Sequence, residues 1–291
     1  MTGHCSSSTK YLLAMAFIGV LLAASAEAKK PKPAPIRPIS IGVFWTPDSA
    51  TYFGGDAGMQ GIAETEIRDK FRIALGNSGL LASQGYDVSL ATFPGVVRDD
   101  VAPGVAGGSC DLDEIRAFFG LNPALRQVRK AKKLSIVILL VQCHDTKGTG
   151  EKNRFGVTYI PVRPQDFKDP GTGVIVIEVG SLAAPQNVVA VHEIGHTFGG
   201  CHPEGCGTSE SAASGKKPSA YPYGLGIYLA KLHPSDPLES DALGNKPGLP
   251  QLFFSHPGRD EFGRITGDQK HNATRAIREN WTNVYGLASL R

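Results

Sequence analysis

One short segment holds three histidines and a glutamate at intervals that suit a zinc ion. Residues 191 to 202 read VHEIGHTFGGCH, which places His192, Glu193, His196 and His202 in the pattern H-E-x-x-H-x-x-G-x-x-H. Histidines four residues apart project from the same face of a helix. His192 and His196 can therefore direct ring nitrogens at one ion, and we expect His202 to be the third ligand.

Two glycines follow the second histidine. Gly199 and Gly200 can adopt positive φ, which would end the helix and let the chain turn back so that His202 reaches the ion. Three protein ligands leave one position of a four-coordinate zinc ion open, as in catalytic sites. A structural or storage zinc site is the alternative, since Cys201 and Cys206 lie near enough in sequence to fill that position.

The glutamate gives the site its expected chemistry. Glu193 follows the first histidine ligand, near a water molecule at the open position but without occupying that position. It can accept the proton of this water as the water attacks a carbonyl, and then donate the proton to the leaving group. We therefore expect one catalytic Zn²⁺ and hydrolysis of peptide bonds by a zinc-dependent endopeptidase, with Glu193 as general base and acid.

Segments of strand and helix character alternate ahead of and through this motif. Predicted strands cover residues 39–45, 86–93, 134–143, 156–162 and 173–180. Predicted helices cover residues 61–79, 112–120, 124–133, 187–199 and 267–287. The run at 134–143 is apolar on both faces, which is typical of a central strand. The alternation predicts a layered α/β domain, with the motif on a helix.

The N-terminus has the order of a secretory signal. Lys10 precedes an apolar run of about 13 residues, shorter than the roughly 20 that a membrane-spanning helix needs, and small residues follow up to Ala28. We expect a signal peptide at residues 1–28 and a Lys/Pro-rich tether at 29–38. The protein would then be secreted, extracellular or periplasmic, without stable membrane insertion after cleavage. The four positive charges of the tether exceed the net charge of +3, so no footprint for nucleic acid is expected.

Four cysteines remain after Cys5 leaves with the signal peptide. An even number in an oxidising compartment favours disulfides, although free buried thiols are the alternative. Of the three possible pairings we favour Cys201 with Cys206, because they are close in sequence, and Cys110 with Cys143 by elimination.

The motif resembles the zinc signature of the metzincin metallopeptidases. Residues 41–47 are similar to the opening strand of reprolysin-like members, and residues 77–79 resemble a shortened form of their helix end. Residues 221–228 and 253–275 are similar to segments that follow the zinc site in bacterial reprolysin-like sequences.

The resemblance implies an α/β (α+β) fold with a twisted mixed sheet, packed helices and a zinc helix at the cleft. The catalytic domain would cover residues 39–291, with an upper subdomain at about 39–200. A smaller irregular lower subdomain at about 201–291 would end in a helix. A protein or peptide substrate would bind extended along an edge strand by main-chain hydrogen bonds. Residues 156–162 are the candidate edge, and an internal strand is the alternative.

The chain departs from this family in its methionines. The family places a methionine beneath the zinc, yet Met1, Met15 and Met59 all precede the motif. Leu249 or Leu252 would have to supply the apolar floor. This departure leaves two alternatives open: a zinc-bearing binding protein or adhesin without turnover, and a zinc amidase that acts on cell-wall peptides.

Overall fold

The computed structural model describes much of the chain between residues 35 and 290. The described residues are 35–95, 109–145, 155–161, 163–183, 188–200, 254, 256–259, 265–267 and 272–290. The chain divides into two units, residues 1–35 and 36–291, and every helix and strand below belongs to the second unit. The expected signal peptide and most of the tether lie outside the described residues.

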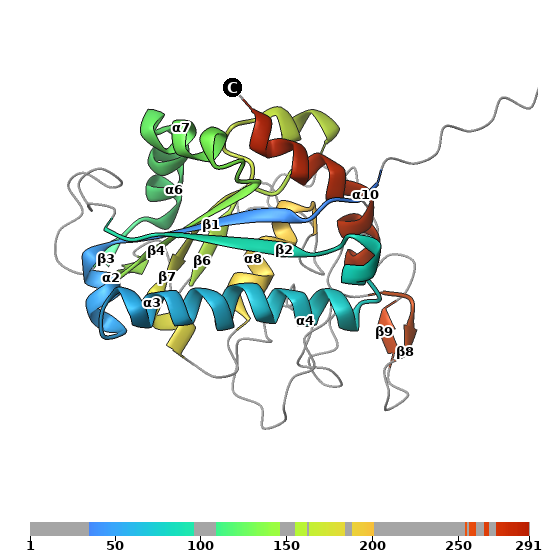
Figure 1. The fold of residues 1–291 in the computed structure, drawn as a ribbon, viewed down its shortest axis with the longest axis horizontal. Helices are drawn as coiled ribbons and strands as arrows, with labels where there is room; N and C mark the ends of the chain where they lie inside the picture. Colours follow the sequence, from blue (N-terminus) through green and yellow to red (C-terminus); the bar gives the residue numbers. More distant parts are fainter. Residues whose placement is uncertain are drawn as a thin grey trace, which may run out of the picture. The chain divides into compact units, whose positions relative to one another are not determined.

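The second unit is built around a five-stranded sheet with the order β2-β1-β4-β7-β6 (Figure 1). The strands are β1 (Ile39–Trp45), β2 (Val88–Phe93), β4 (Ile136–Val141), β6 (Gly156–Thr158) and β7 (Val174–Glu178). The first four in the sheet order are parallel, and β6 pairs antiparallel with β7. β4 is central and buried along its whole length, which confirms the prediction from its unbroken apolar sequence.

Helices cover both faces of this sheet (Figure 1). One face packs against α6 (Leu112–Leu121) and α7 (Pro123–Ala131). The other face packs against a continuous helical segment, against α8 (Val189–Thr197) and against α10 (Ala273–Gly286). The continuous segment consists of α3 (Asp56–Ile62), η2 (Ala63–Asp69) and α4 (Lys70–Asn77). Alternate residues of β4 enter the two cores, since successive side chains of a strand point to opposite faces. The mixed α/β architecture agrees with the expected fold class.

The segment α3-η2-α4 begins earlier than the sequence pattern predicts. α3 spans Asp56–Ile62, the π-helical η2 spans Ala63–Asp69 and α4 spans Lys70–Asn77. Trp45 Nε1–H donates to Asp56 Oδ1 at 2.8 Å, so a contact with β1 fixes the first turn. Gly79 follows the last turn with φ of +73°, as expected for a glycine after a helix end.

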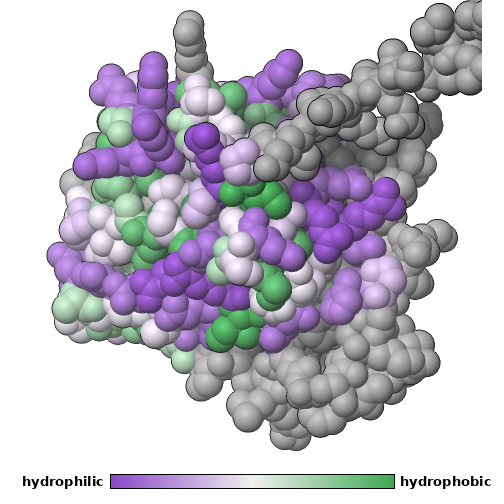
Figure 2. Space-filling model, turned by 45° about the vertical axis from the view of Figure 1, so that its right-hand side comes forward, coloured by the Kyte–Doolittle hydropathy of each residue, from purple (hydrophilic) through white to green (hydrophobic). Residues whose placement is uncertain are grey.

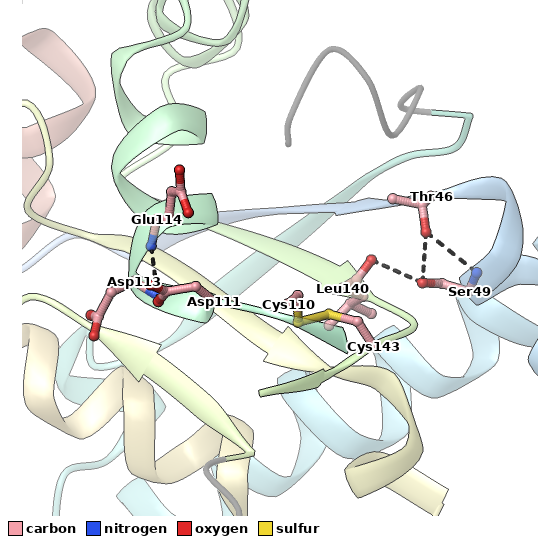
Figure 3. The surroundings of a disulfide bond; sticks show 8 residues. All are labelled: Thr46, Ser49, Cys110, Asp111, Asp113, Glu114, Leu140 and Cys143. Atoms are coloured by element: carbon pink, nitrogen blue, oxygen red, sulfur yellow. Dashed lines mark hydrogen bonds between the residues drawn. A yellow bond between two sulfur atoms is a disulfide. The ribbon is translucent and has the colours of Figure 1, made fainter. Parts of the chain in front are cut away.

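A disulfide joins the start of α6 to the end of β4 (Figure 3). Cys110 and Cys143 have Cα atoms 5.8 Å apart, which confirms this predicted pairing. The next residue, Asp111, caps α6 because its Oδ1 accepts from the backbone N–H of Asp113 and of Glu114 (Figure 3). Cys201 and Cys206 lie outside the described residues.

Short elements complete the described part. They are α2 (Pro47–Tyr52), β3 (Ser109–Cys110), β5 (His144–Asp145), β8 (Gly258–Arg259), β9 (Ile265–Gly267) and the 3-10 segments η3 (Ala82–Gln84), η4 (Pro164–Lys168), η5 (Val179–Ala183) and η7 (Leu287–Ser289). Within the described ranges, no helix has the length and apolar character needed to cross a membrane.

On the face drawn in Figure 2, hydrophilic residues predominate and hydrophobic residues form small patches between them.

Candidate metal centre

α8 carries the first two histidines and the glutamate of the motif. All of its residues, Val189 to Thr197, are buried, because the helix lies between the sheet and neighbouring helices. Its apolar residues join the core cluster that also contains β1, β4 and β7. Gly199 has φ of +83° and its N–H donates to His196 O at 2.8 Å, so the helix ends where the sequence predicts.

The rings of His192 and His196 face one point in space. Their Nε2 atoms are 2.9 Å apart, their centroids are 4.4 Å apart and their planes make an angle of 83°. Two nitrogens bound to one tetrahedral zinc ion at about 2.0–2.1 Å would lie about 3.4 Å apart. Both side chains are buried, His192 at 7% and His196 at 3% exposure. This pair of convergent imidazole nitrogens fits a zinc ion, with a small opening of the pair on binding.

A backbone carbonyl orients the second histidine. His196 Nδ1 lies 2.7 Å from the carbonyl oxygen of Gly200. A carbonyl can only accept, so Nδ1 carries the proton and Nε2 keeps its lone pair in the neutral ring. Metal-binding histidines commonly have such a partner on the other ring nitrogen. The motif gave no signal for this contact beyond the presence of Gly200 after the helix.

Glu193 lies against the edge of the sheet. Its side chain is buried, and it is next to Gly156 of β6. A Cβ atom built on Gly156 would be 2.8 Å from Glu193 Cγ and 3.0 Å from Glu193 Oε1. β6 lies at one end of the strand order of the described sheet, so residues 156–158 of the candidate edge at 156–162 form an edge strand there. The strand ends at Thr158, and residue 162 lies outside the described residues. Sequence reasoning did not identify Gly156 as part of the site.

An aromatic cluster fixes the end of α8. Phe198, the last residue before the glycines, is fully buried and stacks on Phe71 at 6.2 Å and on Trp281 at 5.5 Å between centroids. Asn280 Nδ2 of α10 donates to Phe198 O at 3.0 Å. α10 and α4 therefore hold the turn from which His196 receives its carbonyl partner.

The third expected ligand, His202, lies outside the described residues, as do Leu249 and Leu252. Among the residues that are described, no group of three or more histidine, cysteine, aspartate or glutamate side chains is arranged to hold a metal. The described part of the site is thus the convergent pair His192 and His196, with Glu193 beside them.

Comparisons with known proteins give a fold but no family. No family model matches the chain, and no curated protein matches its sequence. A chain of a solved chaperone–substrate complex has a TM-score of 0.56 and 15% identity, over 88% of this chain and 35% of that chain. Metalloproteinase-II from Bacteroides fragilis has a TM-score of 0.37 and 16% identity, over 60% of this chain and 45% of its own. The chain spans less than half the length of both, and the first likeness concerns the fold alone.

Proposed function

We propose that this protein is an exported zinc-dependent endopeptidase of the metzincin type. His192, His196 and His202 would hold the zinc ion, and Glu193 would act on the water that attacks the peptide bond. The observation that carries the proposal is the 2.9 Å approach of the two Nε2 atoms on one buried helix, with Glu193 adjacent.

The residues of α8 have separate tasks in this reaction. A zinc ion, when bound, polarises the scissile carbonyl and lowers the pKa of water toward about 7. Glu193 accepts the proton of the attacking water and delivers it to the departing amine nitrogen. The Gly200 carbonyl holds the proton of His196 on Nδ1, so that Nε2 is ready to bind without further deprotonation.

The edge strand supports a peptide as the substrate. Glu178 N–H donates to Phe155 O at 2.9 Å, so Phe155 occupies a hydrogen-bonded position of the antiparallel ladder. Because these positions alternate, the main-chain groups of Gly156 and Thr158 point away from β7. An extended peptide can add itself as a strand on these groups, which places its backbone beside Glu193.

The disulfide supports export, because such bonds persist in oxidising compartments such as the periplasm and the extracellular space. Together with the edge strand, this leads us to propose a protein or peptide substrate that the enzyme meets outside the cytoplasm.

The test is cleavage of a diverse peptide pool by the parent and by Glu193→Gln, with zinc quantified in both. Glu114→Gln is the matched control, since Glu114 is exposed on α6. We expect about one zinc ion per chain in all three proteins and a loss of at least about 100-fold in kcat for Glu193→Gln only. Cleavage by Glu193→Gln at the parental rate would refute the mechanism. Zinc without cleavage by the parent would favour a binding protein or adhesin, and cleavage of cell-wall peptides alone would favour an amidase.

A further inference from the structure

Gly156 is a glycine whose backbone conformation does not require glycine. Its φ lies outside the left-handed region, unlike that of Gly79 or Gly199. Within a strand, glycine costs stability because it loses more conformational freedom on folding and has no side chain to pack. Its presence at the first position of β6 therefore needs another reason, and close approach of a neighbouring group is the usual one.

The three atoms nearest to the position of a Cβ on Gly156 all belong to α8. A Cβ on Gly156 would lie 2.8 Å from Glu193 Cγ, 3.0 Å from Glu193 Oε1 and 3.0 Å from Val189 Cγ1. Distances of this size are shorter than van der Waals contacts between such atoms, which are about 3.5–4.0 Å. α8 is buried on every side and cannot retreat as a body, so the side chain of Glu193 would have to move.

We propose that Gly156 is a positioning residue for Glu193: the missing side chain leaves the space in which the Glu193 carboxylate is held. This inference rests on the proposed function, in which Glu193 is the general base. β6 then contributes twice to catalysis, by main-chain groups that face an incoming peptide and by the space that it leaves for the carboxylate.

Gly156→Ala should lower the catalytic rate much more than the stability of the fold. The three atoms in the way all belong to side chains and none to the backbone, so rotation of the Glu193 side chain can relieve the collision and Gly156→Ala should fold with some loss of stability. The displaced carboxylate would no longer meet the attacking water, and a misplacement of about 1 Å is enough to lower a rate about 100-fold. Zinc binding by the histidines and docking of the peptide backbone do not depend on the position of this carboxylate.

The experiment compares the full-length, signal-free parent with Gly156→Ala and Gly156→Val. Gly76→Ala is the matched control, because Gly76 is exposed on α4 and a Cβ there meets nothing within 4 Å. The measurements are kcat, KM, zinc per chain, the thermal unfolding midpoint and a crystal structure of zinc-loaded Gly156→Ala. We expect kcat to fall about 100-fold for alanine and further for valine, while KM stays within about twofold and zinc content is unchanged. Gly76→Ala should keep the parental kcat.

A parental kcat in Gly156→Ala, or a Glu193 carboxylate in its parental position, would overturn the proposal. If Gly156→Ala does not fold, Val189→Ala is added to remove one collision, and Val189→Ala alone becomes the reference.

Failure of the proposed function gives a different result. If the parent cleaves no peptide, the position of the Glu193 carboxylate in the crystal structures still tests the positioning role. A carboxylate displaced in Gly156→Ala would support that role and refute only the peptidase activity. An unmoved carboxylate would refute the positioning role.

Discussion

Replacement of Phe198 by alanine should show how much the end of α8 depends on the aromatic cluster. Phe198 is fully buried between Phe71 and Trp281, and its ring stacks on both. Loss of a buried phenylalanine side chain costs about 3–5 kcal/mol, which includes about 0.5–1.5 kcal/mol for each aromatic contact. At about 1.4 kcal/mol per factor of ten, the folding equilibrium would weaken more than about 100-fold. The turn between His196 and Gly200 would loosen as well.

The assay is urea unfolding of the parent, Phe198→Ala and Phe198→Leu with chelator present, so that bound metal does not add to stability. Leucine keeps most of the volume and should cost about 1.5 kcal/mol. Phe118→Ala is the control, because Phe118 is 40% exposed on α6 and should change stability by no more than about 0.5 kcal/mol. A loss below about 1 kcal/mol for Phe198→Ala, or an equal loss for Phe118→Ala, would refute the reasoning. Zinc affinity, measured by competition, should fall about 10- to 100-fold in Phe198→Ala, as when an outer partner of a ligand is lost.

Two further predictions concern stability away from the motif. Replacing Cys110 and Cys143 by serine removes a cross-link with a sequence separation of 33 residues, which should cost roughly 3.7 kcal/mol in chain entropy relative to the oxidised parent. Urea unfolding measures this loss; the reduced parent should match the serine variant, and an unchanged midpoint relative to the oxidised parent would contradict the prediction. Arg129→Met should cost about 3–5 kcal/mol by thermal or urea unfolding, because the buried guanidinium donates to the carbonyls of Leu134, Ser135, Pro170 and Thr172, which the thioether cannot replace. A methionine variant as stable as the parent would show that these carbonyls find other donors. Burial also lowers the pKa of Arg129 to about 10.

The five strands of the main sheet were predictable because their signals are local, whereas the short strands β3, β5, β8 and β9 have no such signal. β1 coincides with the predicted residues 39–45, since a run of apolar β-branched and aromatic residues is closed by Thr46 and Pro47. These closing residues also begin a short helix, because Thr46 caps α2 and Pro47 is its first residue. The start of α3 was missed because its anchor is Trp45, which the periodicity of the helix itself does not include.

The candidate site was predictable only along the helix. The spacing of His192 and His196 follows from helical geometry and needs no tertiary information. The contact of Glu193 with Gly156, and outside the site the bonds from Arg129 to Pro170 and Thr172, depend on how separate segments pack. No local pattern encodes such contacts, because they arise from the sheet order and from the helices laid on it.

Phe71 contacts both Phe198 and Phe254. These two residues lie immediately before and after the interval 199–253, so both ends of the interval belong to one aromatic cluster. The Phe254 N–H also donates to Ser78 Oγ at 2.7 Å, which fixes the far end of that interval on the end of α4. The entropic cost of closing a chain rises with the logarithm of its length, and a doubling adds only about 0.6 kcal/mol. The two ends of the interval are therefore held together by contacts of the described core, and a change in the length of chain between them adds little to the entropic cost of holding them there.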